Sequence, residues 1–450
     1  MFRIYEIENH REISIATQNF SPANTLIEFA ELAKTPMFVE RLHAEVLEQM
    51  KALTSPSNIE KHSNNEQSRP NAKQNKGRTY VSATYLPRLN EVLLQLRLGR
   101  LPQKMNISRV LTVEINTQIR ELLRKTTGSM ASGAEVTLAL LPMYMPCVYV
   151  EGYEPLFETS KPWKSKRYPK AIFTANRHLY DDVFNFWTAL AVESGSRLVV
   201  AQHGRNYGIS EFPSFSENHE ALVADRYITW GWKTEEPTYR GFALPLIGRR
   251  LHSSRSKDSL LVITDQLWKY PRSIFSDMSE SSTYLDHLKS TINGLQPEIR
   301  HNALLRIHHA HQDAASSQID WWKLHAPDIK QDLGDTNFET RLNESRLLLI
   351  AHNGTSIPEA IALNAPTIIT WSDSYMKVRK SAEAVFDELE AAGVFHRTPE
   401  SAASFINLIW NDVDGWWNSH ATIEARKQFT DQYARTVPNP VRFLAKALQF

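Results

Sequence analysis

The sequence predicts an α/β protein with two doubly wound domains and a C-terminal helical tail. Short apolar runs alternate with helical patterns, this alternation occurs twice along the chain, and residues 401–450 carry helical patterns alone. Short strands that alternate with helices are typical of βαβ units and a parallel sheet. A chain of 450 residues has room for two or three domains of ordinary size.

The first domain is predicted over residues 1–240. It begins with a helical pattern over residues 21–53, followed by residues 54–79, which are rich in Ser, Asn, Gln and Lys. Such a composition cannot bury enough apolar surface to offset the entropy of ordering, so we predict a mobile insertion there. Strands are then predicted at 108–113, 136–141, 171–174 and 197–201, and helices at 92–98, 114–124 and 180–194.

The second domain is predicted over residues 241–400, with the tail over 401–450 packing back on the first domain. Its strands are predicted at 259–263, 303–307, 347–351 and 367–371, and the tail helices at 401–410 and 422–435. Ligands of doubly wound sheets bind outside the carboxyl ends of the strands. We therefore expect the functional site in a cleft between the two domains.

The composition excludes several classes of protein. The chain holds 51 Lys and Arg against 50 Asp and Glu, a net charge of +1, which argues against a dedicated nucleic-acid binder. The mean hydropathy is −0.40, and neither a membrane-spanning run nor the apolar core of a signal peptide is present. A single cysteine, Cys147, excludes an internal disulfide and a cysteine zinc site. We expect a cytoplasmic enzyme.

A glycine-rich segment, residues 202–208 (QHGRNYG), directly follows the predicted strand at 197–201. Glycines at a carboxyl strand end let the backbone approach a ligand closely, and His203 can move a proton or donate to an anionic group. The alternative is a turn with a packed histidine. The other residues expected in the cleft are Gln202, Gly204, Arg205 and Tyr207.

A second segment, residues 352–360 (HNGTSIPEA), follows the predicted strand at 347–351. Its small residues lead into a helix whose first N–H groups can accept a phosphate, and the carboxylate in the first turn can hold ribose hydroxyls. This is the pattern of a nucleotide-sugar site, and a simple helix N-cap is the alternative. The expected donor residues are Gly354, Thr355, Ser356 and Glu359.

Arg306 and His308 stand at the end of the predicted strand at 303–307. Arg306 can clamp a phosphate or a sugar carboxylate, and a structural ion pair is the equal alternative. Neither the histidines near His308 nor the D-x-D at 412–414 has the placement of a metal site, so no metal is expected. P-loop, dinucleotide-binding, H-E-x-x-H and G-x-S-x-G motifs are absent.

Two carboxylates are candidates for the chemistry. Glu151 follows the apolar run at 148–150, and Asp225 opens the alternating segment at 226–232. Two carboxylates beside one sugar can divide the roles of nucleophile and acid/base. We expect both at strand edges facing the cleft, and the alternative for each is a surface or capping residue.

Residues 186–208, 224–232 and 356–371, together with the tryptophan-containing tail, carry a resemblance to a known family. They resemble a family of transferases from bacterial surface-polysaccharide clusters and, more distantly, the retaining β-Kdo glycosyltransferases of lipopolysaccharide O-antigen and capsule synthesis. The resemblance covers about residues 80–440. It implies two Rossmann-like domains in the GT-B arrangement and a CMP-β-Kdo donor used without a metal.

The resemblance also implies roles for single residues. In the retaining Kdo enzymes an Asp is the nucleophile and a Glu assists, and these roles fall on Asp225 and Glu151. Arg205 departs from the family pattern, which often has a second Gly there, although an Arg at this point can bind an anionic sugar.

We therefore expect a glycosyltransferase that moves Kdo from CMP-Kdo to a lipid-linked surface glycan, with no bound cofactor. The alternatives are an enzyme of the same fold that uses a UDP- or GDP-sugar, and a non-catalytic module that binds a glycan or a partner. Residues 442–448 are expected to pack on the first domain. The alternative is that this segment makes a peripheral contact with a membrane.

Overall fold

The computed structural model describes only part of the chain, and every structural statement below concerns that part. The predicted helical pattern at 21–53, the insertion at 54–79 and the strands at 108–113 and 136–141 lie wholly or almost wholly outside it. The described residues are 79–100, 112–126, 142–160, 168–204, 206–211, 213–234, 237–249, 258–265, 267, 281–307 and 312–449.

The chain divides into two compact units. One comprises residues 1–72, 106–165 and 178–190, and the other comprises residues 73–105, 166–177 and 191–450 and contains both sheets. The predicted domain boundaries after residues 240 and 400 stay predictions. In the described part, the first unit holds α5 (Thr117–Thr126), η1 (Cys147–Tyr149), α7 (Tyr153–Ser160) and most of α8 (Asp182–Glu193).

The first sheet has five parallel strands in the order β1-β2-β3-β4-β5. The predicted strands at 171–174 and 197–201 are found with these bounds, and Phe173 pairs with Val199 in the core. The strands are β1 (Tyr80–Ser82), β2 (Ala171–Thr174), β3 (Arg197–Ala201), β4 (Arg226–Ile228) and β5 (Thr238–Tyr239), accompanied by α4 (Arg88–Arg97), η2 (Arg177–Leu179), α9 (Phe215–Val223) and η3 (Leu244–Leu246).

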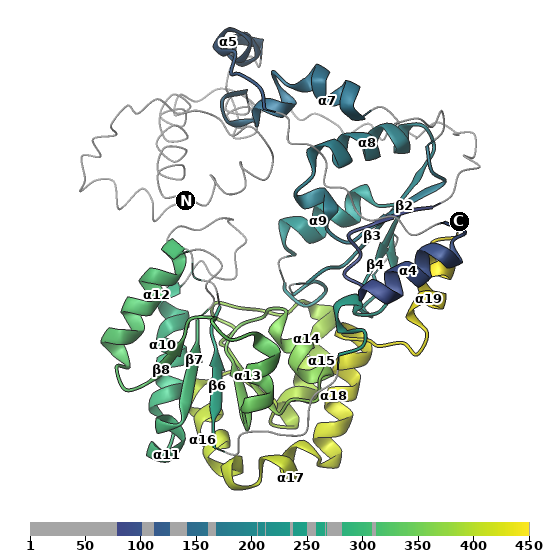
Figure 1. Cartoon of the computed structure of the whole chain (residues 1–450). Helices are drawn as coiled ribbons and strands as arrows, with labels where there is room; N and C mark the ends of the chain where they lie inside the picture. Colours follow the sequence, from purple (N-terminus) through teal and green to yellow (C-terminus); the bar gives the residue numbers. More distant parts are fainter. Residues whose placement is uncertain are drawn as a thin grey trace, which may run out of the picture. The chain divides into compact units, whose positions relative to one another are not determined.

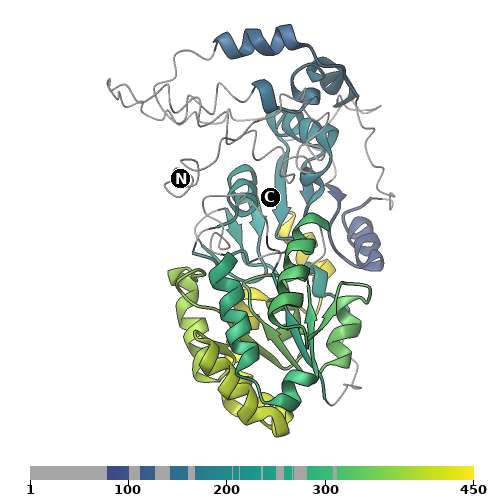
Figure 2. The same ribbon diagram turned by 90° about the vertical axis from the view of Figure 1, so that its left-hand side faces the viewer.

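The second sheet has six parallel strands in the order β11-β10-β9-β6-β7-β8. Its central strands are buried along their whole length because helices cover both faces of the sheet (Figures 1 and 2). The strands are β6 (Leu260–Ile263), β7 (Ala303–Arg306), β8 (Lys330–Asp332), β9 (Leu347–Ile350), β10 (Thr367–Thr370) and β11 (Phe395–His396). The helices are α10 (Ser281–Asn293), α11 (Pro297–His301), α12 (Gln312–His325), α13 (Phe338–Glu344), α14 (Ser356–Ala362) and α15 (Lys380–Ala391).

The strand order of the second sheet reverses between β6 and β9. The chain first runs outward from β6 through β7 to β8, then returns to the other side of β6 and continues through β9, β10 and β11. This is the strand order of the Rossmann fold, whose ligand crevice lies at the reversal. The predicted α/β class with Rossmann-like parallel sheets is confirmed, and the described strands of the first sheet follow the chain order.

The predicted tail divides between the two sheets. Helix α16 contacts α10 and β10, and α18 contacts α14 and α15, whereas α19 contacts α4 beside the first sheet (Figure 1). Leu444 and Leu448 of this last segment are buried in the core of the first sheet, which leaves Arg442 and Lys446 exposed. The tail elements are α16 (Pro399–Ile409), η4 (Trp410–Asp412), α17 (Val413–Trp417), α18 (His420–Tyr433) and α19 (Pro440–Ala447).

None of the described helices combines the length and the apolar character that crossing a bilayer requires.

Candidate functional site

The carboxyl ends of the two sheets meet at the two glycine-containing segments. Gly204 follows β3 of the first sheet, and Thr355 follows β9 of the second. A Cβ atom added to Gly204 would lie 3.2 Å from the Thr355 hydroxyl oxygen. The structure therefore brings these two segments together at the strand reversal of the second sheet.

Backbone contacts fasten the loop after β3 to the segment before α15. Ser210 and Val378 form an isolated antiparallel bridge, and the Arg379 N–H donates to the Ile209 carbonyl over 2.7 Å. The Arg379 guanidinium donates to the Ser210 carbonyl over 3.0 Å and to the Glu217 carboxylate over 2.9 Å. Residues on both sides of the meeting point are thus held in fixed register.

Gln202 has a structural role instead of the expected place in the cleft. Its side chain is 2% exposed, and its Oε1 accepts from the Trp230 N–H and from Trp232 Nε1, each over 2.9 Å. Trp230 Nε1 donates to the Gln202 carbonyl over 3.0 Å. Gln202 therefore joins the QHG segment to the TWGW segment of the sequence.

Gly208 and Tyr207 also belong to the core below the site. Gly208 has φ +78°, and a Cβ atom there would lie 2.5 Å from the Trp232 ring. Tyr207 is buried, with its ring edge-on to His203 at a centroid distance of 5.6 Å. Tyr207 therefore supports the histidine and does not line a cleft. Arg205 lies outside the described residues.

A buried carboxylate stands beside His203. The Nδ1 atom of His203 lies 3.4 Å from Oε1 of Glu220, whose side chain is completely buried. The Tyr227 hydroxyl donates to the other carboxylate oxygen of Glu220 over 3.1 Å, and the Tyr85 ring stacks on His203 at 6.3 Å. A carboxylate this close to a histidine ring stabilises the charged form of the ring, which favours uptake of a proton.

Glu220 was not among the predicted residues. It lies on α9, one helical turn after Glu217, and only the tertiary structure shows that it faces His203. Burial raises the pKa of Glu217, against the lowering effect of the Arg379 guanidinium, and the nearby Glu220 raises it further. The His203 side of the site thus rests on two neighbouring buried carboxylates.

The segment after β9 holds an asparagine that the prediction also missed. Asn353 is 7% exposed, and neither its amide nitrogen nor its amide oxygen has a hydrogen-bond partner among the described residues. Its backbone N–H donates to the Met376 sulfur over 3.1 Å. Buried amides without partners are rare, and each one needs an explanation. Because ligands of Rossmann-like sheets bind at the strand reversal, a ligand that supplies the missing hydrogen bonds would explain this buried amide.

The predicted donor residues around Asn353 differ in their contacts. The Ser356 hydroxyl is engaged by His352 Nε2 at 3.0 Å, so it is used inside the loop. Thr355 occupies the N-cap position of α14, and its side chain makes no capping hydrogen bond. The simple N-cap alternative is therefore not what the structure shows, and Gly354 and Thr355 stand next to Gly204 across the site.

Glu359 pairs with a residue of the segment that connects the two sheets. Its carboxylate lies 3.4 Å from Arg249 Nη1. Burial raises the pKa of Glu359, Arg249 lowers it, and the nearby Glu339 raises it again. Glu359 is thus a largely buried acid with one cationic partner.

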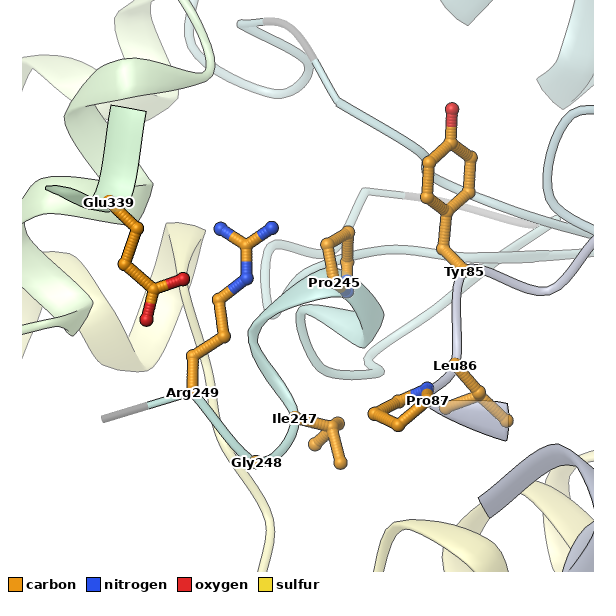
Figure 3. A pocket seen from close by; sticks show the side chains of 8 residues that line it. All are labelled: Tyr85, Leu86, Pro87, Pro245, Ile247, Gly248, Arg249 and Glu339. Carbon is orange, nitrogen blue, oxygen red and sulfur yellow. The ribbon is translucent and has the colours of Figure 1, made fainter. Parts of the chain in front are cut away.

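Arg249 and Glu339 also line a cavity of about 550 Å³ (Figure 3). The cavity wall combines these two charged side chains with the ring of Tyr85 and with aliphatic groups. Tyr85 is thus shared, because its ring also stacks on His203 at a centroid distance of 6.3 Å. Its lining residues are Tyr85, Leu86, Pro87, Pro245, Ile247, Gly248, Arg249 and Glu339.

Arg306 forms the structural ion pair that was weighed as its alternative. Its guanidinium donates to Asp332 over 2.7 Å and to the Thr336 carbonyl over 2.9 Å, and Arg341 donates to the same carboxylate over 2.9 Å. Burial alone would raise the pKa of Asp332, but the Gly334 N–H and the two arginines outweigh it and lower the pKa. His308 lies outside the described residues.

Asp225 lies at the opposite edge of the first sheet from His203, which corrects the expectation that it faces the cleft. Its carboxylate accepts from Arg197 Nη1 over 2.9 Å and from the Leu198 N–H over 2.8 Å. Asp225 precedes β4, and Leu198 is near the start of β3. In a parallel sheet these positions form the amino edge, whereas His203 follows the carboxyl end of β3.

Glu151 follows the 3₁₀ helix η1 and not a strand, which corrects its expected setting. Its carboxylate accepts from Arg120 over 2.6 and 2.7 Å and from the Asn116 N–H over 2.9 Å, all within the first compact unit. Burial alone would raise the pKa of Glu151, but these hydrogen bonds outweigh it and lower the pKa. The structure therefore gives Glu151 a structural partner in Arg120.

The D-x-D at 412–414 has a local role. The Asp412 side chain accepts from the Gly415 N–H over 2.9 Å and caps α17. Within the described residues, no group of three or more His, Cys, Asp or Glu side chains is placed to hold a metal ion.

Comparison with solved structures finds similar chains at low identity. HepE of Anabaena in complex with UDP-glucose has a TM-score of 0.42 at 13% identity and covers 82% of this chain and 98% of that chain. WaaG, a glycosyltransferase involved in lipopolysaccharide biosynthesis, has a TM-score of 0.36 at 10% identity and covers 82% and 99%. MurG of Acinetobacter baumannii has a TM-score of 0.38 at 11% identity and covers 82% and 98%.

No curated protein matches the chain. The model of the LIC12162 family transferases matches residues 24–448. Because this match spans nearly the whole sequence, the chain belongs to the LIC12162 family of transferases.

Proposed function

We propose that this transferase is a glycosyltransferase that binds a nucleotide sugar at the strand reversal of the second sheet. One observation carries the proposal: the amide of Asn353, which has no hydrogen-bond partner among the described residues, is buried at the reversal, beside the point where Gly204 and Thr355 meet. Nucleotides bind Rossmann-like sheets at this place. His203 follows β3 directly before Gly204, so a proton-accepting group stands next to the donor site.

The donor residues supply complementary groups in this proposal. The Asn353 amide offers two donors and an acceptor, and the backbone N–H groups at Gly354 and Thr355 bind a phosphate. Glu359 receives ribose hydroxyls, and Arg249 balances the negative charge of the phosphates. Arg306 is left out of this set because Asp332 and Thr336 occupy its guanidinium.

His203 acts as the general base in a single displacement. Its Nε2, on the ring edge away from Glu220, takes the proton of the acceptor hydroxyl while the acceptor oxygen attacks the anomeric carbon. The bond from that carbon to the nucleotide phosphate breaks, and its electron pair leaves with the phosphate. Glu220 stabilises the charged imidazole that forms. This route inverts the configuration at the anomeric carbon.

The retaining route implied by the Kdo resemblance needs a carboxylate at the anomeric carbon. Asp225 was the residue expected there, and its carboxylate is held at the amino edge of the first sheet by Arg197 and Leu198. The proposed mechanism therefore uses His203 in place of Asp225. The donor implied by the resemblance is CMP-Kdo, with UDP- and GDP-sugars as alternatives, and the implied acceptor is a lipid-linked surface glycan.

A non-catalytic module that binds a glycan or a partner is the second candidate. It requires a ligand site but no proton acceptor. The completely buried Glu220 beside His203 favours the enzyme. Burying a carboxylate costs free energy, and charged groups buried at such a cost are typical of active sites.

The test combines nucleotide binding with turnover. Thermal unfolding is measured with CMP, UDP, GDP and ADP, since a nucleotide at about 100 times its dissociation constant stabilises the native state by about 2.7 kcal/mol. Sugar donors of the stabilising nucleotide are then incubated with the protein, and release of free nucleotide is followed. His203→Gln should keep the thermal shift and lose turnover, whereas the matched control Asp225→Asn should keep both.

Two results would contradict the proposal. If none of the four nucleotides changes the melting temperature, the second sheet does not hold a nucleotide. If His203→Gln turns over like the wild type while Asp225→Asn does not, the chemistry follows the retaining route.

A further inference from the structure

Helix α4 presents apolar side chains to solvent on one face. Leu89, Leu93 and Leu96, which we call the leucine stripe, are 69%, 44% and 49% exposed. Their spacing of four and three residues places them on the same face of the helix. The helix is already fixed on its other side, because Leu94 is buried in the core of the first sheet and α19 packs against α4. The stripe is therefore not needed for the contacts that hold α4 in place.

Exposed cations lie on the same helix as the leucine stripe and on its neighbour. Arg88 and Arg97, the first and last residues of α4, are exposed and form no ion pair with any described residue. The neighbouring helix α19, drawn beside α4 in Figure 1, adds exposed Arg442 and Lys446. The one acid of α4, Glu91, accepts a hydrogen bond of 2.6 Å from the Thr84 hydroxyl. The surface thus combines an apolar stripe with an excess of positive charge.

We infer that α4 docks on the surface of an anionic lipid bilayer. A helix that lies in a membrane interface has an apolar face against the acyl chains and Lys or Arg toward the headgroups. The long stems of Arg88 and Arg97 can cover apolar surface while their guanidinium groups reach phosphate. A second copy of this chain is a poorer occupant, since pairing two such surfaces would bring like charges together.

Helix α5 offers a comparison within the same chain. It also exposes apolar side chains, at Ile119, Leu122 and Leu123. However, its arginines are paired with carboxylates, Arg120 with Glu151 and Arg124 with Glu121. Both described arginines of α5 thus have an acid beside them, whereas Arg88 and Arg97 of α4 have none among the described residues.

Docking through α4 would bring the site to a lipid-linked acceptor, and this benefit rests on the proposed function. Tyr85, Leu86 and Pro87 line the cavity beside Arg249, and α4 begins at the next residue. A bilayer against α4 would thus lie close to residues that line this cavity, which would bring a lipid-linked acceptor near the site. The docking itself does not depend on which reaction the site performs.

The test is vesicle co-sedimentation of the full chain. Vesicles of phosphatidylcholine are compared with vesicles that also contain phosphatidylglycerol, at low and high salt. The wild type should bind the anionic vesicles and lose them at high salt, because salt screens the arginines. Replacing the whole leucine stripe by Gln should lower the partition coefficient at least about tenfold, since each leucine buries several carbon atoms in the interface.

A control set carries the same substitution on isolated leucines. Leu222, Leu324 and Leu408 are 80%, 77% and 77% exposed and lie on three different helices, so they form no stripe. Their triple Gln variant should bind vesicles like the wild type. Nucleotide-induced thermal shifts, measured without vesicles, should be unchanged in both triple variants, so failure of docking is distinguishable from failure of the donor site.

The inference is overturned if the wild type does not bind anionic vesicles, or if the stripe variant binds them as well as the control set does. It is also overturned if only Gln substitutions at Ile119, Leu122 and Leu123 release the protein. Light scattering tests the alternative that a second copy of this chain binds to α4. A molar mass that halves in the stripe variant would show that α4 mediates self-association.

Discussion

Replacing Asn353 by Leu should make the protein more stable and its nucleotide binding weaker. The amide of Asn353 is buried without a hydrogen-bond partner among the described residues, so the unliganded fold pays for its desolvation. Leucine has nearly the same shape and no polar atoms. The change therefore removes a cost from the free protein and removes ligand contacts from the complex.

The size of both effects follows from the same two atoms. An unsatisfied buried donor or acceptor costs about 1–3 kcal/mol, and replacing it by an apolar group of the same shape recovers this cost. We expect the free energy of unfolding to rise by about 1–2 kcal/mol, since the new methyl groups fill the space imperfectly. Nucleotide affinity should fall by about 1–3 kcal/mol, or roughly 5- to 150-fold.

Urea unfolding without ligand and calorimetric titration with the stabilising nucleotide measure the two effects. Asn407→Leu is the matched control, because the Asn407 amide is fully engaged: its oxygen accepts from the Gln296 N–H and its nitrogen donates to the Gly294 carbonyl, each over 2.9 Å. This control should lose stability and keep nucleotide affinity. If Asn353→Leu loses as much stability as Asn407→Leu, the amide has a structural task and the reasoning fails.

Three further outcomes are expected. Glu220→Gln should lower turnover about 10²- to 10³-fold and leave nucleotide affinity unchanged. The charges of Glu220 and a protonated His203, 3.4 Å apart, attract each other by at most about 5 kcal/mol at an effective dielectric constant of about 20. Initial rates measured over a range of pH test this. Gly208→Ala should lower the free energy of unfolding by about 2–4 kcal/mol in urea titrations, because its Cβ would lie 2.5 Å from the Trp232 ring at φ +78°. His287 should cost stability on acidification: burial lowers its pKa from 6.5 to about 4, so its contribution is complete above pH 6.5 and is lost toward pH 4, by up to about 3 kcal/mol, and a His287→Gln variant should show a flatter pH dependence of unfolding.

Each of these outcomes has its own control. Tyr227→Phe removes the 3.1 Å hydrogen bond to Glu220 but keeps the charge, so its turnover should fall far less than that of Glu220→Gln. Ala at Gly248, which also has positive φ but nothing within 4 Å of its Cβ position, should cost only the backbone strain. For His287, an unchanged slope of stability between pH 6.5 and pH 4 in the Gln variant would show that other groups titrate there.

The second sheet was predictable because burial leaves a strong trace in the sequence. Strands β6, β9 and β10 are buried along their whole length: β6 and β9 are uninterrupted apolar runs, and β10 has two isoleucines between threonines. Strand β8, with the sequence KQD at the edge of the sheet, has no such run and was missed. Edge strands β5 and β11 are only two residues long, too short for any period to show.

The meeting of the two glycine segments was predictable for a different reason. Each follows the carboxyl end of an apolar strand, one in each sheet, and ligands of doubly wound sheets bind outside these ends. The same rule separates Asp225 from His203: Asp225 precedes its strand, so it lies at the amino edge. The error was to infer a cleft position from proximity to a strand without regard to the direction of that strand.

Glu220 and Asn353 show what the sequence alone does not reveal. A carboxylate in a helix is ordinarily solvated, and nothing in the spacing of α9 indicates that Glu220 is buried against His203. Asn353 looks like an ordinary turn residue in the segment HNGT, and its significance is a missing hydrogen bond. Both residues are recognised by their neighbours in space, a carboxylate against a histidine and an amide without hydrogen bonds, and these neighbours are defined only in the folded chain.

The contacts between the two sides of the site make them interdependent. Arg379, which lies between β10 and α15 of the second sheet, donates to the Glu217 carboxylate on α9 and to the Ser210 carbonyl in the loop after β3. Glu217 lies one turn before Glu220 on α9, and Glu220 positions His203. A nucleotide that ordered the loops after β9 and β10 would therefore also steady the helix that carries the partner of the base. In the proposed mechanism, donor binding and proton transfer would thus be linked through Arg379 and one turn of α9.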